Sequence, residues 1–188
     1  MTRTSDLAES PQVDAPAIFA TVGTHEDPFD RLIRELDRLV GSGEIQGTAS
    51  IQTGYSTFTP SHCAHQSMID FDAMQIAMRT ADIVITHGGP ASIMQALALG
   101  KVPIVVPRQA KFGEHVDDHQ CRFAARIADR VLVVLDIVAL SATIREYERR
   151  VRGLGSSVGG PERARAFALR FDGLCRSLLP MRAMVRSG

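Results

Sequence analysis

Residues 83–108, IVITHGGPASIMQALALGKVPIVVPR, restrict the possible fold more than any other segment. Two apolar runs, Ile83–Thr86 and Val102–Val106, have the length of buried strands. Between them, Ser92–Leu99 has helical spacing and is followed by Gly100, a residue that suits a helix C-terminus. Parallel strands need a crossover connection, which is usually a helix. The segment therefore predicts a strand–helix–strand unit of a parallel sheet.

The same alternation continues along most of the chain. The predicted strands are Ile18–Val22, Thr48–Thr53, Ala64–Ile69, Ile83–Thr86, Val102–Val106 and Val131–Leu135. The predicted helices are Phe29–Val40, Asp70–Thr80, Ser92–Leu99, His119–Ala128 and Ile137–Val151. Apolar strands separated by helices indicate an α/β fold, with a parallel sheet covered by helices on both faces. The 188 residues suffice for one such domain and are too few for two.

Three segments flank the predicted domain, which spans 17–152. Residues 1–16 are polar and lack an apolar core, so we expect a disordered leader rather than a signal peptide. Residues 153–161, GLGSSVGGP, predict a flexible joint. Residues 162–188 predict an amphipathic helix and tail with six arginines, which either docks on a partner or anionic lipid or packs on its own sheet. No apolar stretch approaches the ~20 residues that span a bilayer, so we expect no transmembrane span.

Charge and cysteine content argue against several functions. The formal net charge is zero, which does not favour a nucleic-acid-binding protein. The three cysteines are widely spaced without a CxxC pair, so we expect no disulfide framework or zinc cluster and a reducing, cytosolic setting. The first predicted strand is followed by GTHEDP rather than GxGxxG, and no Walker A sequence occurs. A nicotinamide oxidoreductase is therefore not favoured.

The joint His87–Pro90 lies at the carboxyl end of a predicted strand, directly before a helix. Ligands of open parallel sheets bind beyond such strand ends. A helix N-terminus presents unpaired N–H groups and a partial positive charge, which suits a phosphate. Gly88 and Gly89 carry no Cβ and allow the backbone to approach a ligand, and Ser92 can add a hydroxyl donor. The alternative is a tight turn with a capping serine and no ligand.

A second polar cluster is GEHVDDHQ, residues 113–120, at the start of a predicted helix. Its side chains can form hydrogen bonds with sugar hydroxyls, or they can be the solvated first turn of a helix. His115 and His119 stand four residues apart, but no HExxH accompanies them, so we expect no metal site.

The loop after the first predicted strand, GTHEDP, forms a third candidate. Thr24 and His25 are expected at the mouth of the sheet. Histidine titrates near neutral pH, so His25 is a candidate general base, or it is an ordinary loop residue.

Together these stretches resemble a known enzyme family. VGTHEDPFDRLI, THGGPASIM, VPIVVPR and GEHVDDHQ are similar to the nucleotide-sugar-binding half of MurG-type GT-B transferases, glycosyltransferase family 28. More narrowly, they resemble the small PssE-like subunits of exopolysaccharide synthesis. The resemblance covers residues 17–150 and implies one Rossmann-like domain, equivalent to the C-terminal half of a GT-B fold.

The resemblance also implies roles for particular residues. The segment that binds the diphosphate would contain Gly88, Gly89 and Ser92. Gln95 would contact the ribose, at a position where similar proteins usually hold a glutamate. An uncharged amide gives a weaker hydrogen bond there than a carboxylate. The donor-sugar contacts would be Asp118, His119 and Gln120, and the cleft-facing loops would contribute Gly23, Thr24, His25 and His87.

A GT-B enzyme closes two domains around its substrates, and this chain provides one. The resemblance therefore implies a separate, membrane-attached PssD-like partner that supplies the lipid-linked sugar acceptor site at the cytoplasmic face. The expected function is the donor-binding, catalytic subunit of an inverting, UDP-sugar-dependent transferase in exopolysaccharide or capsule synthesis, without a metal or other cofactor. The alternative is a non-catalytic accessory subunit. A UDP-sugar epimerase would need a second domain in the same chain.

Overall fold

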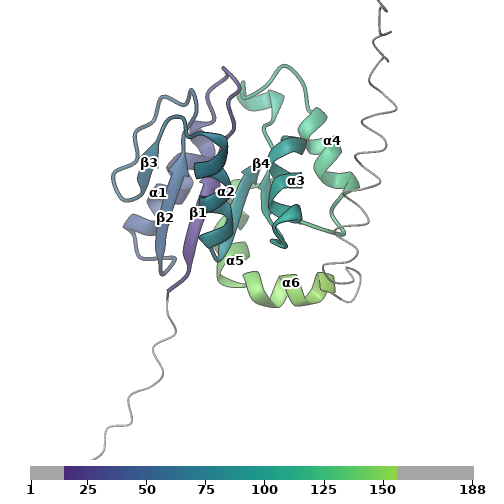
Figure 1. The fold of residues 1–188 in the computed structure, drawn as a ribbon. Coiled ribbons are helices and arrows are strands. Elements are labelled where there is room, and N and C mark those ends of the chain that lie inside the picture. Colours follow the sequence, from purple (N-terminus) through teal and green to yellow (C-terminus); the bar gives the residue numbers. More distant parts are fainter. Residues whose placement is uncertain (1–14, 156–188) are drawn as a thin grey trace, which may run out of the picture.

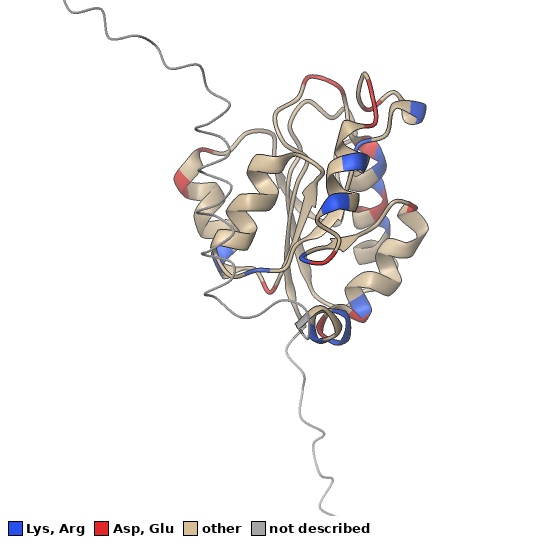
Figure 2. Cartoon of the chain, turned by 90° about the vertical axis from the view of Figure 1, so that its right-hand side faces the viewer, with Lys and Arg blue, Asp and Glu red and all other residues tan. Residues whose placement is uncertain are grey.

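The structure is a computed structural model that describes residues 15–155 of the chain. Its centre is a sheet of parallel strands in the order β3-β2-β1-β4-β5-β6 (Figure 1). The strands are β1 Ala17–Thr21, β2 Thr48–Gln52, β3 Ala64–Gln66, β4 Ile83–His87, β5 Ile104–Val106 and β6 Leu132–Val133. None of these strands contains a charged Lys, Arg, Asp or Glu, and the charged side chains lie on helices and loops (Figure 2). Such strands suit a sheet that is buried on both faces.

Helices cover both faces of the sheet (Figures 1 and 2). One face carries α1 Asp30–Gly41, α5 Leu140–Arg145 and α6 Tyr147–Gly155, and the other carries α2 Phe71–Thr80, α3 Pro90–Ala98 and α4 His119–Arg126. The alternation of side chains along a strand divides the core between these faces. Ile18 and Ala20 of β1 pack with α1, whereas Phe19 packs with α2 and α3. The predicted α/β class and the parallel sheet are therefore confirmed.

The predicted helix Ile137–Val151 is interrupted in the structure. A 3-10 turn, η2 Ile137–Ala139, leads into α5, and Glu146 then separates α5 from α6. The hydroxyl of Tyr147 donates a hydrogen bond to the carbonyl of Val102 at 2.8 Å, which fixes the start of α6 against the sheet. Helical periodicity continues across this break because both helices place apolar residues on the same core.

The flanking predictions fall largely outside the structure. Residues 1–14 and 156–188 are not described, so the predicted leader and C-terminal helix and tail lie mostly or wholly outside the described residues. The last described helix, α6, continues to Gly155 and so includes the first residues of the predicted joint. Within residues 15–155, no helix combines the length and apolar character needed to cross a membrane.

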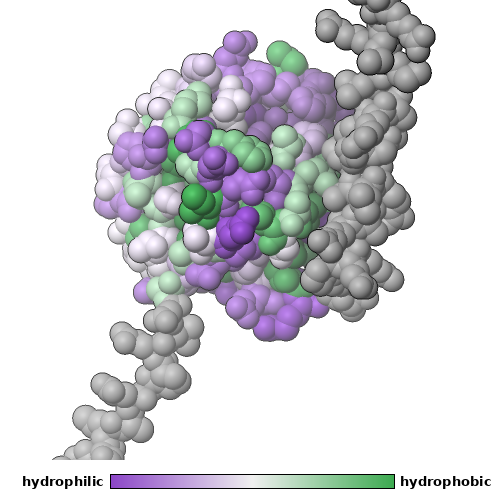
Figure 3. All heavy atoms as spheres, in the orientation of Figure 1, coloured by the Kyte–Doolittle hydropathy of each residue, from purple (hydrophilic) through white to green (hydrophobic). Residues whose placement is uncertain are grey.

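The surface that carries α2 mixes polar and apolar side chains (Figure 3). Phe71 and Ile76 of α2 are 67% and 63% exposed, respectively. Single apolar side chains at a surface are common in soluble domains.

The loop between β2 and β3 contains no helix and is held by α1. Asp37, a buried residue of α1, accepts hydrogen bonds from the backbone N–H groups of Ser61, His62 and Cys63 at 2.7–3.1 Å. Burial raises the pKa of Asp37, but these N–H donors outweigh it and leave the pKa below its usual value. The carboxylate therefore stabilises the loop in its charged form.

We expect Asp37→Asn to lower the free energy of unfolding by about 1–3 kcal/mol. The substitution replaces one carboxylate oxygen, an acceptor, by an NH2 group that cannot accept hydrogen bonds from the backbone N–H groups of the loop. The folded-state pKa of Asp37 lies below the unfolded value, so its contribution is present above the unfolded pKa and is lost as pH falls through the folded pKa. Urea denaturation between pH 3 and pH 7 measures both effects. Asp129→Asn, at a 62% exposed side chain, is the control and should change stability little. An Asp37→Asn loss no larger than that of the control would contradict the assignment.

Candidate functional site

The strand order places a topological switch point between β1 and β4. The chain leaves β1 toward α1 on one face of the sheet and leaves β4 toward α3 on the other (Figure 1). Ligands of open α/β sheets bind in the crevice at such a point, outside the carboxyl ends of the strands. The loops that border it are residues 22–28 and 87–90, which contain two of the three candidate segments.

His87, the last residue of β4, lies between two glycines of these loops. A Cβ built on Gly23 would come within 2.6 Å of His87 Cε1, and a Cβ on Gly89 would also collide with the ring. Gly23 has a φ of +78°, a conformation that glycine adopts without strain. The two glycines therefore have a packing function, because they make room for the imidazole.

Gly88 fits closely against a second predicted site residue. A Cβ on Gly88 would lie 2.6 Å from Gln120 Cβ and 3.0 Å from Gln120 Oε1. Gln120 is buried, and its Oε1 accepts the backbone N–H of Arg108 at 3.1 Å. The structure thus brings the His87–Pro90 joint and the start of α4 together, as a shared site requires. Gln120 Oε1 therefore already accepts a hydrogen bond from Arg108, so a contact of Gln120 with a sugar would involve its other amide atom or a second hydrogen bond to Oε1.

The N-terminus of α3 has the features expected of an anion site. Gly89 is the N-cap residue, Pro90 begins the helix, and no side chain caps it. Ser92 is partly buried in the first turn. The amide Nε2 of Gln95, one turn later, is buried without a hydrogen-bond partner among residues 15–155. A buried donor without a partner costs about 1–3 kcal/mol, so Gln95 Nε2 can donate to a partner from outside the described residues.

The imidazole of His87 is electrically neutral near pH 7. Burial, and secondly the charge of Arg108, lower the pKa of His87 to about 4. Among residues 15–155, no atom forms a hydrogen bond with its buried Nδ1, as for Gln95 Nε2. A neutral ring beside the joint does not contribute positive charge toward a phosphate.

Arg108, directly after β5 and Pro107, ties the loops of the site together. Its side chain is fully buried, and its guanidinium donates to the carbonyls of Val22 at 3.0 Å, Asp27 at 2.6 Å and Glu114 at 3.1 Å. It also lies over the ring of Phe29, 4.9 Å from the ring centroid. The loop after β1 and the loop after β5 therefore share one buried cation. We assigned Arg108 no role from the sequence, although it ends the VPIVVPR motif.

A second buried interaction supports the same loops. The guanidinium of Arg31 in α1 forms a bidentate pair with Glu114, with N–O distances of 2.7 and 2.8 Å. The Glu114 carboxylate also accepts the backbone N–H of Gln109 at 3.0 Å. Both side chains are largely buried, so the pair fixes α1 to the loop after β5. This pairing was also absent from the sequence predictions.

Three histidines form a row at the edge of the site. The ring of His115 lies between those of His25 and His119, with centroid distances of 4.5 and 4.4 Å, respectively. His25 Nδ1 accepts the backbone N–H of Asp27 at 3.2 Å, which engages that nitrogen's lone pair. The predicted base and the predicted sugar contact His119 are thus brought near one another. Thr24 beside His25 is exposed.

Asp118 has a partner within the loop. Its Oδ1 accepts the backbone N–H of Ala110 at 2.8 Å, which closes the loop between β5 and α4.

An Asp-x-Asp triplet of the kind that can bind a metal also occurs, at Asp70–Asp72. Asp70 accepts the N–H of Ala73 at 2.7 Å and caps α2, so a helix cap accounts for its carboxylate.

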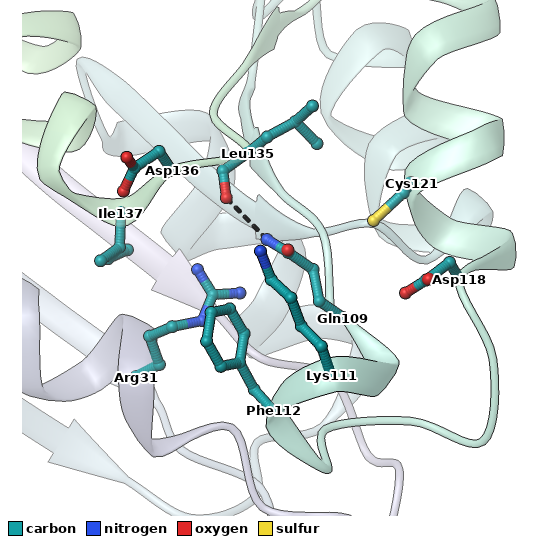
Figure 4. A pocket seen from close by; sticks show the side chains of 9 residues that line it. All are labelled: Arg31, Gln109, Lys111, Phe112, Asp118, Cys121, Leu135, Asp136 and Ile137. Carbon is teal, nitrogen blue, oxygen red and sulfur yellow. Dashed lines mark hydrogen bonds between the residues drawn. The ribbon is translucent and has the colours of Figure 1, made fainter.

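A cavity of about 490 Å³ lies beyond the ends of β5 and β6 (Figure 4). Its lining residues are Arg31, Gln109, Lys111, Phe112, Asp118, Cys121, Leu135, Asp136 and Ile137. Across it, Gln109 Nε2 donates to the carbonyl of Leu135 at 2.6 Å. His87, Ser92 and Gln95 do not line this cavity. We place the candidate site at the β4–α3 joint because it lies at the switch point, where the uncapped start of α3 is close in sequence to the unpartnered amide of Gln95 within the described residues.

The fold and the joint define a doubly wound α/β domain of the kind that forms the C-terminal half of GT-B glycosyltransferases. The sequence pattern of the Glycosyltransferase family 28 C-terminal domain matches residues 17–150. The chain therefore belongs to this family.

Solved structures share this fold at low sequence identity. The glycotransferase of kitacinnamycin has a TM-score of 0.57 and 16% identity, with 96% of this chain and 48% of that chain covered. CalG4, the calicheamicin glycosyltransferase, has a TM-score of 0.50 and 16% identity, with 92% and 45% covered. The chain thus spans about half the length of these enzymes. No curated protein matches it significantly.

Proposed function

We propose that the chain is the donor-binding, catalytic subunit of an inverting glycosyltransferase that uses a UDP-sugar. The observation that carries the proposal is the β4–α3 joint at the switch point, where an uncapped helix N-terminus lies near the unpartnered amide of Gln95. Free N–H groups at a helix start bind phosphate oxygens. Gln95 Nε2 offers a donor to a ribose hydroxyl, and Ser92 offers its hydroxyl to the diphosphate.

The proposed reaction is a direct displacement at the anomeric carbon. The acceptor hydroxyl loses its proton to a base as its oxygen forms a bond to that carbon, and the bond to the diphosphate oxygen breaks. The helix N-terminus stabilises the negative charge that develops on the leaving diphosphate. His25 is the candidate base, and using it requires Nδ1 to release the N–H of Asp27. Asp118 and His119 would contact the donor sugar.

The acceptor site would come from another chain. This chain covers 48% and 45% of the two solved glycosyltransferases compared above, so a domain that binds the acceptor would have to be added to the domain described here. We propose a membrane-attached, PssD-like partner that presents a lipid-linked sugar at the cytoplasmic face, for exopolysaccharide or capsule synthesis. The chain would then be peripheral to the membrane through this partner.

The second candidate is a non-catalytic accessory subunit. It is favoured by Gln95, because the carboxylate expected at this position would bind ribose hydroxyls more strongly than an amide. An accessory subunit would retain the fold and the joint without binding a donor.

Calorimetric titration with UDP tests the proposal. The wild-type chain should bind, and Ser92→Ala should weaken binding about tenfold or more, since a hydrogen bond to a charged group is worth about 1.5–3 kcal/mol. Gln95→Glu should tighten binding several-fold through charge-assisted hydrogen bonds to ribose. The matched controls, Ser61→Ala and Gln46→Glu, lie at exposed positions away from the joint and should leave affinity unchanged.

Absence of binding at millimolar UDP leads to a second titration with the partner subunit co-expressed. Binding that then appears and depends on Ser92 supports a site completed by the partner. Absence of binding in both titrations contradicts donor binding and favours the accessory subunit.

A further inference from the structure

The end of the loop before α4 and the first residue of that helix bring together three potential metal ligands. His115, Asp117 and His119 each offer one ligand atom, and these atoms all lie within 4.8 Å of one another. Asp117 Oδ1 is the centre of the group: it shares a hydrogen bond with His119 Nδ1 at 2.5 Å and lies 3.8 Å from His115 Nδ1. A bound metal ion would replace the proton of that hydrogen bond. The three residues are two positions apart in the sequence, and the conformation of the chain at the start of α4 brings their side chains together.

His115 contributes an observation that hydrogen bonds among residues 15–155 do not explain. Its side chain is 11% exposed, and its Nδ1 is buried without a hydrogen-bond partner in that part of the chain. Asp117 Oδ1 is too distant at 3.8 Å for a hydrogen bond with this nitrogen. Unpartnered buried nitrogens of this kind are rare, and a bound ion is one of their recognised explanations.

The surroundings of Asp117 orient its carboxylate toward the histidines. Arg122 Nη2 holds Oδ2 at 3.1 Å, so Oδ1 remains directed at the two rings. Outer contacts that fix a ligand in this way are a regular feature of metal sites. The positive charge of Arg122 opposes a cation, but its side chain is 62% exposed and contacts Oδ2 rather than Oδ1, so solvent screens this charge.

We propose that His115, Asp117 and His119 bind a divalent transition-metal ion of the zinc type. Two imidazoles and one carboxylate are the ligand chemistry that zinc accepts, whereas magnesium and calcium prefer oxygen ligands alone. Three protein ligands leave a coordination position for water or for a ligand oxygen. The proposed transferase reaction does not require this ion, but the two proposals share His119, so the test below measures metal binding rather than transferase activity.

The protonation states of the ligands agree with the site. Burial, and then the charges of His119 and His25, lower the pKa of His115, which favours the neutral imidazole that a metal needs. Hydrogen bonds from the backbone and ring of His119, together with Arg122, lower the pKa of Asp117 to about 2. The carboxylate is therefore ionised throughout the neutral range.

Cobalt(II) titration of the untagged, full-length, EDTA-treated chain tests the proposal, because tetrahedral cobalt absorbs visible light. We expect one equivalent of cobalt to bind, with zinc displacing it. His119→Ala and Asp117→Asn should each weaken binding by about tenfold or more. His119 is 45% exposed, so its removal leaves the core intact, and thermal unfolding of the metal-free variants verifies this.

His65→Ala is the matched control, because His65 lies on the edge strand β3 and is exposed. It should bind cobalt like the wild-type chain. Equal affinity in wild type and His119→Ala would overturn the proposal. A sulfur-to-cobalt charge-transfer band would also overturn it, since the ligands would then include a cysteine of this chain. Absence of any binding up to 100-fold excess cobalt is a third contradicting result.

Discussion

Replacing Arg108 by methionine is expected to lower the free energy of unfolding by about 3–5 kcal/mol, one of the two largest effects that we predict. The methionine side chain is unbranched and occupies part of the space of the arginine side chain, but it donates no hydrogen bond. The carbonyls of Val22, Asp27 and Glu114 would each lose a donor in a buried setting. Hydrophobic replacement of a buried ion pair is sometimes neutral, but here the partners are backbone carbonyls that the substitution cannot remove.

Two further variants separate charge from geometry. Arg108→Lys keeps the charge but not the planar fork that reaches several carbonyls, so we expect it to retain only a small part of the stabilisation. Arg149→Met removes an arginine whose side chain is 72% exposed and paired at the surface, and should cost less than about 1 kcal/mol. Urea denaturation followed by circular dichroism measures all three. If Arg108→Met were as stable as Arg149→Met, the guanidinium would not hold the loops together.

Gly23→Ala is expected to cost about 2–4 kcal/mol, through two separable causes. The φ of +78° imposes a strain of roughly 1–2 kcal/mol on any residue with a Cβ. The added methyl group also meets the ring of His87 at 2.6 Å, and overpacking of this kind costs about 1–3 kcal/mol. The same variant displaces His87 and so should also reduce ligand binding at the joint.

Gly100→Ala provides the matched control for strain. Gly100 has a φ of +76° and no atom within 4 Å of an added Cβ, so its substitution carries the backbone cost alone. In a His87→Ala background, the cost of Gly23→Ala should fall to that of Gly100→Ala. Thermal denaturation of the four variants and wild type completes this cycle. A penalty that stays unchanged without His87 would show that the ring does not fill the space beside Gly23.

The sequence predicted the elements of this fold better than their connections. Short apolar runs identified β1, β4 and β5 to within two residues, because buried parallel strands are uninterrupted by charge. The break at Glu146 was missed, since apolar spacing continues across it. The strand order was not predicted, because a periodic pattern contains no information about which strands become neighbours.

The candidate site was predicted in outline only. The glycines of the joint suggested close approach by a ligand, whereas the structure shows His87 and Gln120 against them. Two buried interactions were missed because they join residues about 80 positions apart, which a local sequence pattern cannot predict. They are the contacts of Arg108 with the loop after β1 and the pair of Arg31 with Glu114. The unpartnered Gln95 amide was equally invisible, because only packing decides whether a side chain finds a partner.

The central place of β1 has a consequence for the order of folding. Its neighbours are β2 and β4, and β4 is synthesised only after α1, β2, β3 and α2. Until then, one edge of β1 has no partner, and Phe19 lacks the contacts of its core cluster that come from Val84 of β4 and Ala96 of α3. Non-local pairing of this kind slows folding, because the chain must close a long loop before the contact forms. A nascent chain that ends before Ile83 would therefore expose one unpaired edge of β1 at what becomes the middle of the sheet.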